Sequence, residues 1–251
     1  MKGQIKMKEQ TMERLREMKL PGLLAAWNEQ QKNPDFANLS FDERLGMLVD
    51  AEWLDRNNRR VARNMRAAKL KLSSACLEEL DYERNRELDK ALIRKLATCT
   101  WVNHHLSIVI TGATGVGKTF LACALAQHAI RKRYRAIYRR TSRLLDELAL
   151  ARADGTYVRA LAKFARADVL VLDDWGMIEI GAQERRDLNE LLEDRFGERA
   201  TIVTSQLPVD LWHDHIGDPT TADAICDRLL SKCHRIVLKG PSRRKEITAV
   251  N

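Results

Sequence analysis

The sequence predicts an α/β protein in which a parallel sheet with flanking helices follows a small, all-helical N-terminal region. After residue 95, short apolar segments rich in β-branched residues alternate with helical segments, as in a parallel sheet with crossover helices. Before that point, nearly every segment has the composition and spacing of a helix. The 251 residues, 45% of them hydrophobic, suffice for a sizeable core in one or two domains. We expect a helical domain over 1–75, a linker over 76–95 and an α/β domain over 96–251.

Local patterns predict the individual elements. In the N-terminal part, helices are expected over 11–18 and 23–30, with a break at Pro21 between them. Ser40 and Glu43 have the spacing of a capping box, which predicts the start of a long helix. The expected strands are 108–110, 136–138, 169–172, 201–204 and 235–238.

A glycine-rich segment joins the first expected strand to a helix. Residues 112–119 read GATGVGKT and fit the P-loop pattern G-x-x-x-x-G-K-[ST] in its required context. Backbone N–H groups of such a loop bind phosphates at a helix N-terminus, Lys118 reaches the β- and γ-phosphates, and Thr119 coordinates Mg²⁺. A glycine turn before a lysine is the alternative. The predicted site for ATP and Mg²⁺ comprises Gly112, Ala113, Thr114, Gly115, Val116, Gly117, Lys118, Thr119 and Phe120.

Two acids follow the third expected strand. The apolar run 169–172 is typical of a strand buried on both faces, and it ends in Asp173 and Asp174. Carboxylates at this end of a parallel strand lie where α/β sheets bind ligands. Asp173 is therefore predicted to hold Mg²⁺ with Thr119, and Asp174 to orient or deprotonate the attacking water. Two solvated acids at a strand end are the alternative.

The chain is basic, with 43 Lys and Arg against 35 Asp and Glu and a net charge of +8. This excess predicts a polyanionic partner, either nucleic acid or an acidic membrane surface. Because no apolar stretch reaches the length of a membrane span and no signal-peptide pattern occurs, we expect a cytoplasmic protein without a membrane partner. The five cysteines lack C-x-x-C spacing, and His213 with His215 forms only a weak metal pattern.

Arginines recur every three or four positions in the long N-terminal helix, so that they share one face. Only Asp55 supplies an acid near the start of this run, whereas solvated helices usually interleave acids. The run fits a DNA phosphate backbone; a solvated face that covers neighbouring surface is the alternative. We call these residues the arginine stripe: Arg56, Arg59, Arg60, Arg63 and Arg66.

Two further basic clusters lie later in the chain. One flanks the second expected strand and includes Arg139 and Arg140, and the other covers 243–245. Because no zinc-finger or RNA-binding signature accompanies them, phosphate contact and DNA shape are favoured over base readout.

Several segments together resemble one family over nearly the whole chain. They are LPG at 20–22, LSFDERL at 39–45, VDAEW at 49–53, LDKALIR at 88–94, the P-loop, LDDWG at 172–176, TSQLP at 204–208 and DRL at 227–229. The chain resembles the IstB-type helper ATPases of insertion-sequence transposition, which are similar to DnaC-type helicase loaders in the initiator clade of AAA+ proteins. The resemblance implies the AAA+ fold.

The resemblance also implies roles for residues near the P-loop. Thr204, Ser205 and Gln206 stand where AAA+ proteins carry a sensor of the γ-phosphate or attacking water. We take Ser205 as this sensor while the other two remain open, because the family usually has Asn where Gln206 stands. Asp174 occupies the position at which most AAA+ proteins use Glu.

An arginine finger is implied at Arg228, which would act on the nucleotide of a neighbouring subunit. An ordinary ion pair with Asp223 or Asp227 is the alternative, and Arg195 is the second candidate for the finger.

Two features of the C-terminal half follow from the same resemblance. A helical insertion that faces nucleic acid is implied before the acidic strand, with Arg152, Arg159 and Lys163 as its candidate DNA contacts. The eleven residues after Gly240 are too few for a helical lid domain, so a neighbouring subunit is expected to enclose the nucleotide.

These observations favour an ATP-dependent, DNA-binding AAA+ ATPase. It is expected to form a homo-oligomer, as a ring or helix, on duplex DNA and to assist a cognate transposase in target selection or strand transfer. A replicative helicase loader is the alternative with the same fold. A small-molecule P-loop kinase is a third possibility, against which the arginine stripe and the helical N-terminal region argue.

Overall fold

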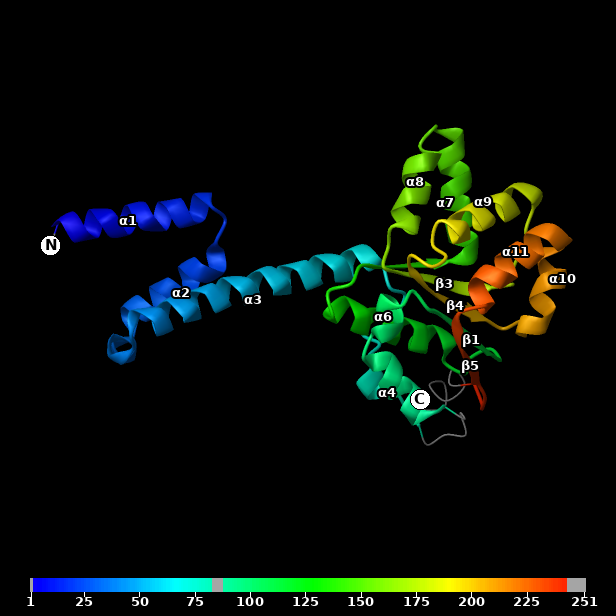
Figure 1. The fold of residues 1–251 in the computed structure, drawn as a ribbon, viewed down its shortest axis with the longest axis horizontal. Coiled ribbons are helices and arrows are strands. Elements are labelled where there is room, and N and C mark those ends of the chain that lie inside the picture. Colours follow the sequence, from blue (N-terminus) through cyan, green and yellow to red (C-terminus); the bar gives the residue numbers. More distant parts are fainter. Residues whose placement is uncertain (1, 83–87, 243–251) are drawn as a thin grey trace, which may run out of the picture. The chain divides into compact units, whose positions relative to one another are not determined.

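The structure, a computed structural model, describes residues 2–82 and 88–242, with side chains from Met7 onward (Figure 1). The chain divides into two compact units, Met1–Arg63 and Asn64–Asn251. Across residues 2–82 and 88–242, no helix has the length and apolar character that a membrane span requires.

The first unit is helical. It contains α1 (Lys2–Glu17), α2 (Pro21–Lys32), the short 3-10 helix η1 (Pro34–Asn38) and most of α3 (Phe41–Ala68). The predicted capping box is present, because the Glu43 N–H donates to Ser40 Oγ at 3.3 Å and the Ser40 N–H donates to Glu43 Oε2 at 2.8 Å. The long predicted helix therefore begins where the sequence indicates.

Helix α2 begins against α3. A Cβ added at Gly22 would lie 2.7 Å from the carbonyl oxygen of Ala51, so only glycine allows this approach. The buried carboxylate of Glu52 accepts the N–H groups of Gly22 at 2.9 Å and Leu23 at 3.2 Å. It thereby satisfies two of the free donors at the start of α2. This contact explains why the chain turns at Pro21.

The second unit is an α/β fold. Its five parallel strands are β1 (Ser107–Gly112), β2 (Ala136–Arg140), β3 (Val169–Trp175), β4 (Ala200–Ser205) and β5 (Cys233–Leu238), in the order β2-β3-β4-β1-β5. The other elements are η2 (Leu77–Glu79), α4 (Lys90–Ala97), α5 (Thr100–Asn103), α6 (Lys118–Arg131), α7 (Thr141–Ala153), α8 (Tyr157–Ala165), α9 (Ala182–Glu193), η3 (Val209–Leu211), α10 (Trp212–Ile216) and α11 (Pro219–Leu230). All five predicted strands are confirmed, and the parallel sheet with flanking helices is the expected fold.

Helices cover both faces of this sheet (Figure 1). Helix α6 packs across β1, β2, β3 and β4 on one face, whereas α7, α9 and α11 lie on the other. Because side chains alternate along a strand, Val109, Leu170 and Val203 enter the core on the second side. The rings of Trp175 and Trp212, with centroids 5.5 Å apart, close this core at the end of β3.

The predicted domain boundaries remain a prediction. The division between the two units falls within α3, and the described part of the segment predicted as a linker, 76–95, belongs to the second unit. The predicted insertion corresponds in position to the α7–α8 hairpin between β2 and β3. The basic cluster 243–245 lies outside the described residues.

Candidate functional site

The P-loop connects β1, which lies between β4 and β5 in the sheet, to α6. Gly112 has φ 148°, and a Cβ there would lie 2.2 Å from the Leu238 carbonyl oxygen of β5. Gly117, the N-cap of α6, has φ 101°, a conformation that side chains disfavour. Because glycine has no capping side chain, the first N–H groups of α6 are left for an anion. The loop is therefore shaped to receive phosphate.

Lys118 is held against this loop. The side chain is buried, and Nζ donates to the carbonyl oxygens of Gly112 at 2.8 Å and Ala113 at 2.9 Å. These bonds keep the ammonium group at the mouth of the loop. A cation in this position can neutralise the charge of bound phosphates.

Asp173 is the centre of a buried hydrogen-bond cluster at the end of β3. Its carboxylate is fully buried and accepts from the hydroxyl groups of Thr119 at 2.9 Å, Thr204 at 2.5 Å and Tyr138 at 2.5 Å. Burial, the hydrogen bond to Asp173 and the charge of that carboxylate raise the pKa of Tyr138 far above its usual value. Tyr138 therefore remains a protonated donor and fixes the carboxylate.

The residues predicted to hold Mg²⁺ are in contact. Thr119 Oγ1 lies 2.9 and 3.1 Å from the two Asp173 oxygens, which brings a hydroxyl and a carboxylate together beside the P-loop. Within residues 2–82 and 88–242, no group of three or more His, Cys, Asp or Glu could hold a metal by itself. Oxygen ligands of this kind, completed by phosphates and water, are what Mg²⁺ uses in nucleotide sites. The donor set therefore fits the ion.

Asp174 is turned out of the strand into the pocket. The register of β3 against β4 shifts between Leu172 and Trp175, and Asp174 has φ 59°. Such irregularities redirect side chains at strand ends. The backbone N–H of Asp174 donates to Thr204 Oγ1 at 3.2 Å, and Arg140 Nε lies 3.4 Å from its carboxylate. Asp174 is thus half-exposed next to the P-loop, whereas Asp173 is fully buried.

A pocket of about 400 Å³ lies over the P-loop. This volume is within the range of small-molecule sites. It is lined by Lys71, Leu72, Thr114, Gly115, Gly117, Lys118, Thr119, Phe120, Asp174 and Gln206.

Thr204 and Ser205 end β4, Gln206 follows the strand, and their side chains have different partners. The buried Ser205 hydroxyl donates to the Trp175 carbonyl and accepts the Leu207 N–H, which commits it to the strand end. Gln206, by contrast, lines the pocket and accepts from the Thr114 hydroxyl at 2.5 Å. Of the three, Gln206 therefore has the geometry for contact with a bound nucleotide.

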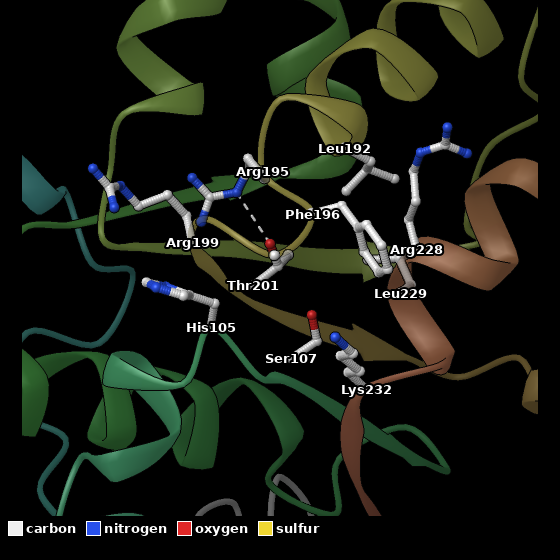
Figure 2. Close-up of a pocket in the computed structure, with 11 residues that line it drawn as sticks. His105, Ser107, Leu192, Arg195, Phe196, Arg199, Thr201, Arg228, Leu229 and Lys232 are labelled. Atoms are coloured by element: carbon white, nitrogen blue, oxygen red, sulfur yellow. Dashed lines mark hydrogen bonds between the residues drawn. The ribbon is translucent and has the colours of Figure 1, made fainter.

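Arg228 lies at the amino ends of the strands, at the opposite end of the sheet from the P-loop. It lines a cleft of about 10 Å³ with Ser107 and Thr201, which stand near the starts of β1 and β4 (Figure 2). Six-residue strands separate this edge from the P-loop edge by roughly 20 Å. The guanidinium pairs with Glu193 of α9, not with Asp223 or Asp227. Figure 2 shows it pointing away from Arg195.

Arg195 holds the fold together at this edge. Its guanidinium is fully buried and donates to the carbonyl oxygens of Phe164 at 2.8 Å and Ala167 at 2.8 Å. It also donates to Thr201 Oγ1 at 3.1 Å (Figure 2). Burial, with the nearby charge of Arg199, lowers the pKa of Arg195 to about 9. These bonds satisfy free carbonyl groups at the C-terminal end of α8. We therefore retain Arg228 as the proposed finger.

The arginine stripe is exposed but partly neutralised. Arg56 Nε lies 2.6 Å from Glu52, and Arg59 Nη2 lies 2.6 Å from Asp55 and 3.7 Å from Glu52. Glu52 is therefore a second acid beside the stripe. Arg60 and Arg63 are exposed, and neither has an ion-pair partner among residues 7–82 and 88–242.

Among the other DNA candidates, Arg140 lies beside Asp174, and the remaining four fall into two groups. Arg139 is buried and donates to Glu147 at 2.6 Å, while Arg152 pairs with the buried Asp187. Arg139 thus joins β2 to α7, and Arg152 joins α7 to α9, so we leave both out of the proposed DNA surface. Arg159 and Lys163 instead line an open hollow on α8, where two more cations join them. We call this set the α8 patch: Arg135, Arg159, Lys163 and Arg166.

Sequence reasoning missed three residues of these sites. Tyr138 lies on β2, and its approach to Asp173 depends on the pairing of Tyr138 with Val171 in β3. Glu52 contacts α2 across thirty residues of sequence. Lys71, which lines the nucleotide pocket, belongs to no motif. Of the three, only Tyr138 could have been suggested by the sequence. Tyr138 and Arg140 are two positions apart in an expected strand, so their side chains share a face and both could approach the acids of the next strand.

The fold and the P-loop site define an AAA+-type nucleotide-binding protein. A family described as IstB-like ATP binding protein matches residues 13–249, and the chain belongs to this family. It is 46% identical over 235 residues to the insertion-sequence ATP-binding protein y4pL of Sinorhizobium fredii, covering 94% of this chain and 96% of that protein. It is 47% identical over 202 residues to the ATP-binding protein of insertion sequence IS1162 from Pseudomonas fluorescens, covering 80% and 87%.

Solved structures support the fold. The chain is similar to DnaI, with a TM-score of 0.57 and 22% identity over 66% of this chain and 92% of that one. It is also similar to the DnaC helicase loader, with a TM-score of 0.56 and 20% identity over 66% of this chain and 97% of that one. At these identities the likeness is one of fold.

Proposed function

We propose that this protein is an ATPase that assembles on duplex DNA and assists the transposase of its insertion sequence. The carrying observation is the site at the carboxyl edge of the sheet, where the P-loop, Asp173 and Asp174 converge in a chain of the IstB-like ATP-binding family. The names of its relatives place them in insertion sequences, which makes the transposase the expected partner.

The geometry supports hydrolysis as well as binding. Lys118 and the N–H groups of α6 would hold the phosphates, and Thr119 with Asp173 would hold Mg²⁺, which stabilises charge on the transferred group. Asp174, exposed in the pocket, would orient or deprotonate the attacking water. Gln206 would position that water or the terminal phosphate.

Assembly would complete the site. Because Arg228 lies at the opposite end of the strands from the P-loop, it cannot reach the nucleotide of its own subunit. As a finger it would exchange Glu193 for the nucleotide of a neighbouring subunit. A finger supplied in trans makes hydrolysis depend on the oligomer. The DNA would contact the α8 patch and the exposed arginines of the stripe through its phosphates.

Phosphate release and assembly test this proposal together. We expect ATP-dependent oligomers on duplex DNA, visible by electron microscopy, and phosphate release that rises with protein concentration and with DNA. A protein that stays monomeric with ATP and DNA would contradict the proposal. A helicase loader remains the second candidate because the fold is similar to that of DnaC. Selective retention of the hexameric helicase over the transposase would favour the loader.

A further inference from the structure

The segment that follows α3 leads into the nucleotide pocket. Helix α3 ends at Ala68, which is fully buried, and Lys69 adopts φ 53°. A left-handed residue at this position stops a helix and redirects the chain. Leu70 is then buried, and Lys71 and Leu72 line the pocket over the P-loop. The end of α3 is therefore only three residues from a side chain of the nucleotide site.

Helix α6 fixes this segment in place. Gln127 Nε2 donates to the Ser73 carbonyl at 3.2 Å, and the backbone of Lys71 and Leu72 lies against the thiol of Cys123. Both anchoring side chains belong to α6, the helix that begins at the P-loop. The backbone position of Lys71 is thus tied to the phosphate-binding helix.

The side chain of Lys71 is held less firmly than its backbone. Nζ lies 3.9 Å from Asp173 Oδ2, which is beyond hydrogen-bond distance, and the side chain is 30% exposed in the pocket. Asp173 already accepts hydrogen bonds from three hydroxyl groups. The ammonium group of Lys71 thus lines the same pocket as Lys118 and borders the space that phosphates would occupy.

We propose that Lys71 is a further nucleotide-binding residue, which contacts the terminal phosphate of ATP and reports its presence to the end of α3. This inference rests on the proposed nucleotide site. A cation held by Thr119 and Asp173 would repel Lys71 from its present position, and the terminal phosphate would offer it a new anionic partner. Lys71 would then have different partners with ATP and with ADP.

The end of α3 would respond to this change in the partners of Lys71. Asn64 Nδ2 donates to the Tyr134 carbonyl at 3.4 Å, and Asn64 and Ala68 are buried in the second unit. The last turn of α3 and Lys71 thus belong to one packed segment, 64–73. We expect its backbone amides to exchange hydrogen more slowly with an ATP analogue than with ADP.

Nucleotide titrations of two variants and a control test the proposal. We expect Lys71→Met to weaken binding of a non-hydrolysable ATP analogue by about tenfold, the value of one charge-assisted hydrogen bond, and to change ADP binding by less than about twofold. Lys71→Arg should recover most of the affinity for the analogue. Lys69→Met is the matched control, because it removes an exposed charge outside the pocket, and it should bind both nucleotides as the parent does.

Hydrogen exchange gives a second readout that does not depend on hydrolysis. Slower exchange over 64–73 with the ATP analogue in the parent protein, and its loss in Lys71→Met, would support the proposal. Equal weakening of ATP and ADP binding, or lowered thermal stability with an unchanged ratio of affinities, would overturn it and leave Lys71 a structural partner of Asp173. Unaltered nucleotide affinity in Lys118→Ala would instead contradict the nucleotide site itself.

Discussion

At the carboxyl edge of the sheet, Asp173 is fully buried and accepts three hydrogen bonds, whereas on α3 the arginines are exposed and two of them are paired with acids. A buried charge needs fixed partners because its desolvation is costly, and those partners also set its geometry. Exposed charges are screened and mobile, so their contribution depends on salt and on the ligand. The Asp173 site thus has the fixed geometry that a reaction needs, whereas the arginines of α3 form an extended surface suited to contact with a large ligand.

Arg228 tests whether the buried site is completed by a neighbouring subunit. We expect Arg228→Ala to keep monomeric ATP binding and to reduce hydrolysis by about a thousandfold, the usual contribution of an arginine finger. Asp174→Asn should also stop turnover, by about a thousandfold, through loss of the water-orienting carboxylate. Phosphate release from mixtures of the two variants is the measurement. Some interfaces then pair an intact acid with an intact finger, so activity should return; co-assembled mixtures without activity would argue that Arg228 acts within its own subunit.

Lys118 tests the phosphate-binding loop directly. We expect Lys118→Ala to weaken ATP binding by about 100-fold, because two or more charge-assisted contacts to phosphate are lost. The fold should persist, since Nζ donates to the carbonyl oxygens of Gly112 and Ala113, which belong to the phosphate-binding loop and not to the apolar core. Titration with a fluorescent ATP analogue and thermal unfolding of the same samples measure both effects. Loss of folding along with binding would show that Lys118 has a structural role.

Glu52 tests how a buried acid organises the N-terminal unit. Although burial opposes ionisation, hydrogen bonds from Arg56, Leu23 and Gly22 hold the pKa of Glu52 below its ordinary value of 4.5. Its contribution to stability is therefore present above that value and is lost as pH falls through the lowered pKa of the folded state. We expect Glu52→Ala to reduce stability by about 2 kcal/mol at neutral pH.

Hydrogen exchange at the amides of Gly22 and Leu23 measures this change locally in the full chain. The variant should exchange them faster at pH 7 and lose most of the difference from the parent in acid. An equal difference at both pH values would show that packing, and not the carboxylate, stabilises the start of α2.

The arginine stripe provides the smallest expected effect. Neutralising Arg60 and Arg63 with glutamine should reduce the salt slope of log K for DNA binding by about two, one for each lost phosphate contact. The matched variant at Arg56 and Arg59 removes the same charge but should change the slope less, because these guanidiniums already neutralise Glu52 and Asp55.

Affinity across a salt series, with two unrelated duplexes, gives both slopes. Parent-like slopes in both variants would show that α3 does not contact DNA. The α8 patch would then be the remaining surface to neutralise.

Prediction from sequence succeeded where a pattern lies within one continuous segment. The P-loop, the capping box at Ser40 and all five strands are local, because each depends on residues a few positions apart. Ser205 and Gln206 show the limit of this reasoning. The sequence places both at the end of β4, but the shift of register in β3 and the contacts to Trp175 and Thr114 decide which one faces the pocket.

The sequence by itself determined the fold class, the nucleotide loop and the acids that follow β3, because backbone geometry and strand periodicity are short-range properties. The tertiary structure alone decided that Tyr138 and Lys71 approach Asp173, that Glu52 supports α2, and that Arg228 lies at the far edge of the sheet. These contacts join residues between thirty and about a hundred positions apart. Their formation depends on strand order and helix packing, which no local pattern specifies.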